Sequence, residues 1–169
     1  MGLFDRFFGT RKTGDVAALY AAIVDRARQP HWYLDGAVPD TMDGRFDMIA
    51  AILSLVLIRL EANRESNAAG VALTESFITD MDAQLRESGI GDVGLGKHVG
   101  NMVSMLGGRL TAYRTGLDTG DLDTALVRNL YRGVAPGPAA MAHVRAAVTR
   151  FAEQLQAAPA EALLAGRLP

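Results

Sequence analysis

The sequence predicts an all-α protein, a single compact helical bundle of about six or seven helices. Apolar residues recur at three- and four-residue steps through almost every segment, which is the period of an amphipathic helix. No segment shows the sustained apolar–polar alternation of a half-buried strand. The 169 residues suit one domain, so we expect a helical domain over residues 15–169 behind a short amphipathic segment, residues 1–14.

The first two predicted helices lie on either side of a loop. Residues 15–28 place apolar side chains on one stripe, with Asp15 as a plausible N-cap and Pro30 as the stop signal. A loop is expected over residues 31–43. The second helix, residues 44–63, is apolar nearly all round through its middle, so it should be the central helix of the bundle.

The third and fourth helices are predicted over residues 71–88 and 93–116. Gly89 stands where a left-handed residue ends a helix, and Asp92 is placed to cap the next one. Interior glycines destabilise a helix, so those of the fourth helix indicate close helix packing, a kink, or a surface that a partner's backbone approaches. These glycines are Gly94, Gly96, Gly100, Gly107 and Gly108.

The C-terminal third continues the helical pattern. Residues 122–132 form a fifth helix, capped by Asp121 or Asp123. Apolar residues over 139–156 keep helical register up to Pro159, and a short helical tail follows.

Composition excludes several kinds of chemistry. The chain has no cysteine, which excludes disulfides, thiolate metal sites and cysteine nucleophiles. The net charge is −2, and residues 15–92 alone carry −7, which would repel phosphate, so no nucleic-acid partner is expected. The most apolar run, residues 48–58, is shorter than the roughly 20 residues that span a bilayer. The chain is therefore expected to be soluble or attached only at a membrane surface.

No catalytic, cofactor or metal site is predicted, and the protein is not expected to be an enzyme. Residues 89–94 match the dinucleotide pattern G-x-G-x-x-G, but they follow a helix and no strand–helix–strand unit surrounds them. His31, His98 and His143 are widely separated and lack metal-ligand spacing. Two of them could instead ligate a haem iron across the bundle, with the seven methionines as further candidates.

A polar segment directly precedes the central helix. It contains Asp40, Thr41, Arg45 and Asp47. One interpretation is an elaborate helix start, a capped turn in which Arg45 folds back onto Asp40 or Asp43. The other is that these groups form part of a recognition surface.

Two stretches share their order and spacing with a known family. One is VPDT followed by GRFD and the apolar helix, and the other is ESFITDMDAQLRESGIGDVGLGKHVGNMVSMLGGRLTAY. The matching residues of the second stretch are Asp80, Met81, Asp82, Leu85, Arg86, Glu87, Gly89, Gly91, Asp92, Lys97, Gly108, Arg109, Ala112 and Tyr113. Over residues 15–135 the chain resembles the ubiquinol–cytochrome c chaperone family of alphaproteobacteria and mitochondria. Mitochondrial members carry long N-terminal extensions, and the shorter chain here is more similar to a bacterial member.

The resemblance implies a non-enzymatic, helical assembly chaperone for ubiquinol–cytochrome c reductase (complex III). Mitochondrial relatives act on newly made cytochrome b together with a second small chaperone, near the ribosomal exit. The implied partners are therefore cytochrome b or other reductase subunits and a second chaperone. The implied location is the cytoplasmic face of the inner membrane.

The residues at the helix junctions suit a binding role. Mixed charges gather at two junctions that the resemblance also identifies, and arginine presents a planar fork that pairs with carboxylates or carbonyls of a partner. We therefore expect a surface that contacts the client or a partner chaperone. Its residues are Asp40, Thr41, Arg45, Asp47, Arg86, Asp92, Lys97, Arg109 and Tyr113.

The N-terminal segment suits a membrane surface. Leu3, Phe4, Phe7 and Phe8 form one apolar face, and nearby basic residues could meet anionic headgroups. The alternative is a frayed terminus, or an apolar strip docked on the chain's own bundle. For the whole chain, the competing functions are a haem-binding or haem-delivery protein and a membrane-surface interaction module without a chaperone role.

Overall fold

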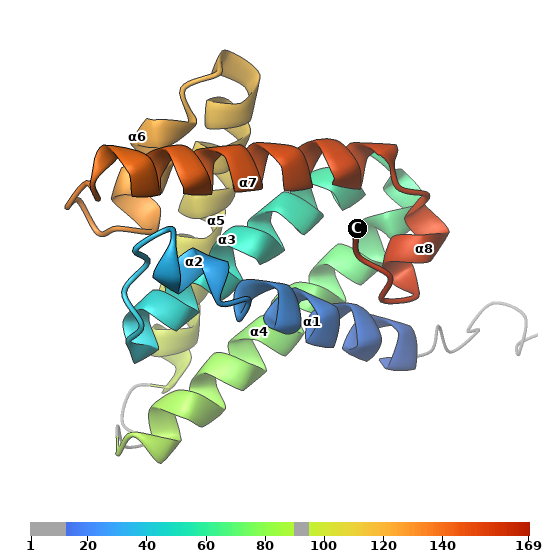
Figure 1. The fold of residues 1–169 in the computed structure, drawn as a ribbon. Coiled ribbons are helices and arrows are strands. Elements are labelled where there is room, and N and C mark those ends of the chain that lie inside the picture. The colour runs from blue at the N-terminus through green and yellow to red at the C-terminus, as the bar shows by residue number, and fades with distance from the viewer. Residues whose placement is uncertain (1–12, 90–94) are drawn as a thin grey trace, which may run out of the picture.

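The computed structural model describes residues 13–89 and 95–169, and this part of the chain contains helices and no strand, which confirms the all-α prediction (Figure 1). The helices, with one 3-10 turn, η2, are in chain order α1 (Thr13–Ala27), α2 (His31–Leu34), α3 (Met42–Glu61), η2 (Arg64–Ser66), α4 (Asn67–Glu87), α5 (Leu95–Thr119), α6 (Leu122–Asn129), α7 (Pro138–Ala157) and α8 (Ala160–Leu164).

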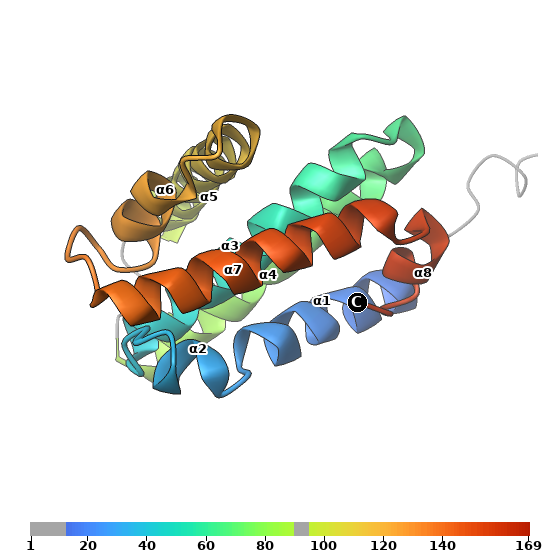
Figure 2. The same cartoon turned by 45° about the horizontal axis from the view of Figure 1, so that its top comes forward.

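Helix α3 is the central helix, as its sequence predicts. Every residue from 47 to 57 is buried, because α1, α4, α5 and α7 all pack against it. In Figures 1 and 2, α5 and α6 form one end of the molecule, while α8 and the C-terminus lie at the other end beside α1. The apolar run is thus the shared core of the bundle, as expected for a helix without a polar face.

The start of α3 explains the residues around it. Thr41 is the N-cap, and its side-chain oxygen accepts a hydrogen bond from the Gly44 N–H at 3.1 Å. Gly44 is required for close approach rather than for an unusual backbone conformation, because a Cβ there would lie 1.8 Å from the Pro39 carbonyl oxygen. The helix begins two residues before the predicted start.

The predicted loop over residues 31–43 contains a helix that the sequence did not indicate. Helix α2 has only one turn, too few residues to show a period. It is anchored by Trp32, which is 1% exposed and donates from Nε1 to the Arg26 carbonyl oxygen at 2.9 Å. Tertiary contact, rather than local propensity, therefore holds this turn.

Helices α4 and α5 differ from the prediction in extent. Helix α4 begins four residues early, directly after η2, and ends as predicted before Gly89, which has φ +87°. Helix α5 extends past the predicted end to Thr119. Within it, a Cβ added at Gly100, Gly107 or Gly108 would meet no described atom within 4 Å. Close packing against the described part of the chain therefore does not account for these three glycines.

The C-terminal part follows the prediction closely. Asp121, not Asp123, caps α6 by accepting from the Thr124 N–H. After α7 and α8 the chain returns to α1, where Gly166 (φ +81°) approaches Ala18 so closely that a Cβ would lie 2.9 Å from its carbonyl carbon. None of the helices in the described residues has the length and apolar content needed to cross a bilayer.

Candidate functional site

A buried carboxylate organises the junction of three elements. Asp47, on the second turn of α3, is 0% exposed and faces two guanidinium groups. Arg109 of α5 donates from Nη2 to Oδ1 at 2.7 Å, and Arg132, after α6, donates from Nε to Oδ2 at 2.7 Å. A carboxylate without water is tolerated only when it is paired and hydrogen-bonded, so Asp47 depends on both arginines.

The turn after α6 aims Arg132 at this carboxylate. Arg132 has φ +51° and Gly133 has φ +87°, so the chain reverses directly after the helix. A non-glycine residue in the left-handed region costs about 1–2 kcal/mol, which the two bonds to Asp47 offset. The hydrogen bond to Asp47 raises the pKa of Arg132, and Asp43 binds its Nη1 at 3.0 Å.

Tyr113 lies one turn beyond Arg109 on α5, in the interior. It is 0% exposed, and its hydroxyl has no hydrogen-bond partner among the described residues. Burial raises the pKa of Tyr113 far above its ordinary value, so the phenol is neutral at any physiological pH. The nearby Tyr131 has a partner, because its hydroxyl donates to the Gly36 carbonyl oxygen at 2.6 Å.

The predicted residues at the start of α3 form the capped turn. Arg45 folds back onto Asp40, with Nε to Oδ1 at 2.7 Å, and both side chains are 60% exposed. This confirms the helix-start interpretation and identifies Asp40, rather than Asp43, as the partner. Both groups remain accessible, so their contact with a client stays a prediction.

The structure divides the predicted contact surface into separate parts. Asp47, Arg109 and Tyr113 come together, but Asp47 and Tyr113 are 0% exposed, so the prediction that these two residues contact a client directly is wrong. Arg86, exposed near the end of α4, binds Asp82 at 2.8 Å. Lys97 lies on the first turn of α5 and its side chain is outside the described residues, as are Asp92 and the predicted membrane face of Leu3, Phe4, Phe7 and Phe8.

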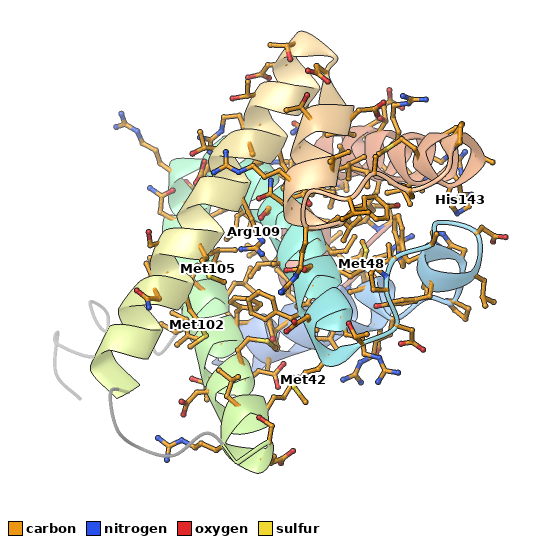
Figure 3. All side chains as sticks on the ribbon, turned by 90° about the vertical axis from the view of Figure 1, so that its left-hand side faces the viewer. Met42, Met48, Met102, Met105, Arg109 and His143 are labelled. Atoms are coloured by element: carbon orange, nitrogen blue, oxygen red, sulfur yellow. The ribbon has the colours of Figure 1, made fainter. Side chains whose placement is uncertain are left out.

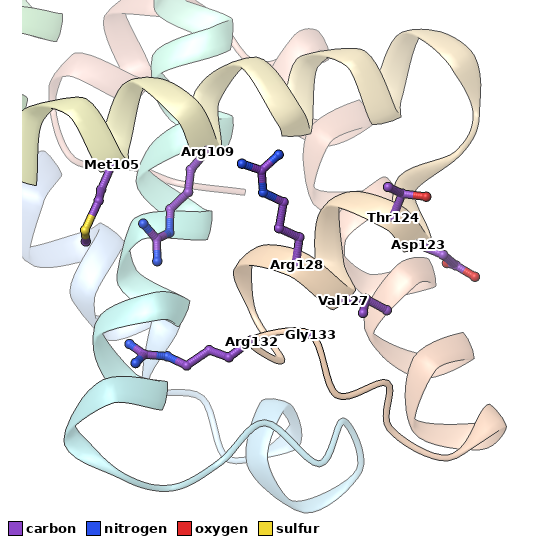
Figure 4. A pocket seen from close by; sticks show the side chains of 8 residues that line it. All are labelled: Met105, Arg109, Asp123, Thr124, Val127, Arg128, Arg132 and Gly133. Atoms are coloured by element: carbon purple, nitrogen blue, oxygen red, sulfur yellow. The ribbon is translucent and has the colours of Figure 1, made fainter.

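Two adjoining hollows lie beside the buried carboxylate, and sequence analysis did not find them. The larger, about 850 Å³, borders α5, α6 and the turn after α6. In Figure 4, Arg109 and Arg132 reach toward the same region from opposite sides, and Arg128 extends from α6 toward α5. Its lining residues are Met105, Arg109, Asp123, Thr124, Val127, Arg128, Arg132 and Gly133.

The smaller hollow, about 260 Å³, is mostly apolar and lies between the start of α3, the end of α4 and the first half of α5. Met42, Met102 and Met105 lie on this side of the molecule in Figure 3. Its lining residues are Met42, Asp43, Phe46, Met81, Gln84, Leu85, Asn101, Met102, Met105 and Arg132. Met105 and Arg132 line both hollows, so we treat them as one feature, the composite groove.

The described histidines do not form an obvious haem site. His31 Nδ1 and His143 Nε2 lie 3.0 Å apart in a hydrogen bond that joins α2 to α7, too close for a porphyrin between them. The side chain of His98 lies outside the described residues. No group of three or more metal-ligating side chains gathers within the described residues.

Comparison with known proteins gives a consistent result. Residues 34–168 match the family model described as "Ubiquinol-cytochrome C chaperone". This match extends beyond the predicted resemblance, residues 15–135, and includes α7 and α8. The chain is similar to a solved structure described as the Cbp3 homolog from Brucella abortus, at 34% identity and a TM-score of 0.84, over 99% of this chain and 95% of that chain. No curated protein matches the chain.

Proposed function

The chain belongs to the ubiquinol–cytochrome c chaperone family, and from that premise we propose that it binds newly made cytochrome b at the membrane surface during assembly of complex III. The family match over residues 34–168 is the observation that carries this proposal, because it includes every described element from α3 to α8. The coarser role, an assembly chaperone for ubiquinol–cytochrome c reductase, follows from family membership.

The molecule offers surfaces suited to holding a polypeptide. The composite groove combines apolar side chains with a cationic end, and the exposed Asp40–Arg45 pair lies at the start of the same helix α3. Buried Asp47 fixes the positions of Arg109 and Arg132 before any partner arrives. Such pre-organisation reduces the entropy that binding would otherwise cost.

The client's chemistry sets the proposed location. Cytochrome b is a membrane protein, so its helper must work at the membrane surface, here the cytoplasmic face of the inner membrane. The apolar face of Leu3, Phe4, Phe7 and Phe8 would provide weak, reversible attachment. We propose that a second small chaperone acts together with the protein in binding cytochrome b.

The test is a deletion strain combined with affinity capture. Cells that lack the protein should lose most of their spectroscopically detected cytochrome b and their assembled complex III, while another respiratory complex stays at its normal level. Tagged protein captured from solubilised membranes should recover cytochrome b. Normal cytochrome b levels in the deletion strain would overturn the proposal. Capture of unrelated membrane proteins without reductase subunits would instead support a general interaction module.

A further inference from the structure

We propose that the composite groove binds an apolar helical segment of the client that carries an acidic side chain at one end. This inference rests on the assembly-chaperone function and adds the surface and the chemistry of the segment it holds. It is carried by the contrast between the two ends of the groove. One end is apolar and rich in methionine, and the other presents three arginines.

The apolar end is suited to a helix of variable sequence. Met42 is 55% exposed and Met105 is 42% exposed, and both line the same hollow, so they form part of a contiguous apolar surface of the kind that marks interaction sites. Phe46 and Met102 line the hollow beneath them. Methionine is flexible and polarisable, and methionine-rich grooves accept amphipathic helices without demanding one side-chain shape.

The cationic end has a charge that the described residues do not neutralise. Arg109 and Arg132 pair with Asp47 and Asp43, whereas Arg128 lines the larger hollow without an ion pair among the described residues, so one positive charge remains. The other acid of the lining, Asp123, is paired with Arg145 at 2.6 Å outside this balance. An acidic side chain of the client would therefore find an unmatched charge here.

Carboxylates in the lining disfavour a phosphate headgroup as the occupant. Asp43 lines the smaller hollow and Asp123 lines the larger one. A phosphodiester offers only acceptor oxygens, which both carboxylates would repel. An apolar helix can instead cover the methionines and bring a single acidic side chain to Arg128.

Fluorescence anisotropy of the full chain with two labelled helical peptides tests the proposal. Both are apolar and about 14 residues long. Both carry a covalent staple that holds the helix, because isolated helices of this length are only marginally stable in water. One ends in Glu and the other in Gln. The Glu peptide should bind about tenfold more tightly, which corresponds to about 1.4 kcal/mol. Arg128→Glu should abolish this preference, and Met105→Ser should weaken both peptides.

Matched controls lie elsewhere on the surface. Arg150→Glu changes an exposed arginine of α7, and Leu34→Ser removes an apolar side chain that is 80% exposed, and neither residue lines the groove. Both should bind the peptides like the unaltered chain. Circular dichroism should show the same helicity for all four variants, since each change is at an exposed position.

Several outcomes would overturn the inference. Equal affinity for the two peptides would show that the acidic side chain is not recognised. Unchanged binding by Arg128→Glu and Met105→Ser would show that the peptides do not bind in the groove. If the protein floats with anionic vesicles and Arg128→Glu abolishes this flotation, the groove binds lipid instead. If the protein self-associates and Met105→Ser abolishes the self-association, the groove binds a second copy of the chain. If a variant that carries both Arg128→Glu and Met105→Ser restores complex III fully in the deletion strain, the proposal for the groove is wrong while the assembly function stands.

Discussion

A single buried carboxylate connects three parts of the chain that are far apart in sequence. Asp47 belongs to the central helix, Arg109 lies 62 residues later and Arg132 lies 85 residues later. Neither arginine could take its position without Asp47, because two guanidinium groups at short range repel each other. The geometry of the cationic end of the composite groove therefore depends on a residue that no partner can touch.

Replacing Asp47 with Asn should destabilise the protein strongly. The change leaves Arg109, whose side chain is only 12% exposed, without its counter-charge, and removing one member of a buried ion pair costs about 3–5 kcal/mol. Urea denaturation should show this loss. The matched control is Asp43→Asn, which breaks an ion pair of Arg132 whose acid is 71% exposed and should cost less than about 1 kcal/mol. Similar losses for both variants would contradict the structural role of Asp47.

Sequence analysis named several residues that the structure places close together, but it predicted their burial incorrectly. Asp47, Arg109 and Tyr113 were expected to act together, and the structure brings them together. They were expected at the surface, because one sequence without tertiary contacts gives no measure of burial for a polar residue. Arg132 was missed since it was predicted to continue a helix, although the following Gly133 is typical of a helix end.

At the scale of elements, hydrophobic periodicity predicted the positions of the long helices and missed features that depend on tertiary contacts. It identified α3 as central and placed α7 within a residue of its ends. It missed α2, which depends on the burial of Trp32, and it placed the start of α4 late, because residues 67–70 are not apolar in pattern. The composite groove was also missed, since it requires the relative placement of α3, α4, α5 and α6.

Two helical glycines should respond in opposite ways to alanine. In Gly44→Ala the new methyl group would meet the Pro39 carbonyl oxygen, a backbone atom that cannot rotate away, and a loss of about 1–3 kcal/mol is expected. In Gly108→Ala the methyl group points into open space, so higher helix propensity should stabilise the chain by about 0.5–1 kcal/mol. Thermal or urea denaturation measures both. Stabilisation by Gly44→Ala would contradict the close approach that shapes the start of α3.

At the scale of the whole molecule, a few long-range polar contacts join helices that the apolar core already holds together. Arg59 of α3 donates to the Leu155 and Ala158 carbonyl oxygens at the end of α7, at 2.8 and 3.0 Å. Tyr20 of α1 donates to Asp80 of α4 at 2.7 Å. His31 and His143 join α2 to the first half of α7. Of these contacts, the one made by His31 involves a group whose ordinary pKa lies near physiological pH, so it should make the packing pH-dependent there.

His31 should lower the stability of the protein as pH falls below about 6.5. Burial, followed by the charges of His143 and Arg26, lowers the pKa of His31 below its ordinary 6.5, although Asp35 opposes this shift. The unfolded chain therefore binds a proton at His31 at a higher pH than the folded chain does. The free energy of unfolding should consequently fall as pH decreases through about 6.5, and this loss should end below the folded-state pKa.

Urea denaturation of the unaltered chain and of His31→Gln at pH 7.5 and pH 5.5 measures this effect. The carboxylates titrate in both proteins, so the difference between the two pH-dependent losses isolates His31. A larger loss is expected for the unaltered chain, because His31 Nε2 donates to the Gln29 side-chain oxygen, so a proton gained at Nδ1 removes the acceptor from the 3.0 Å hydrogen bond with His143. Equal losses, or a His31 pKa above 6.5 by NMR titration, would mean that α2 is held to α7 by Trp32 and its apolar neighbours alone.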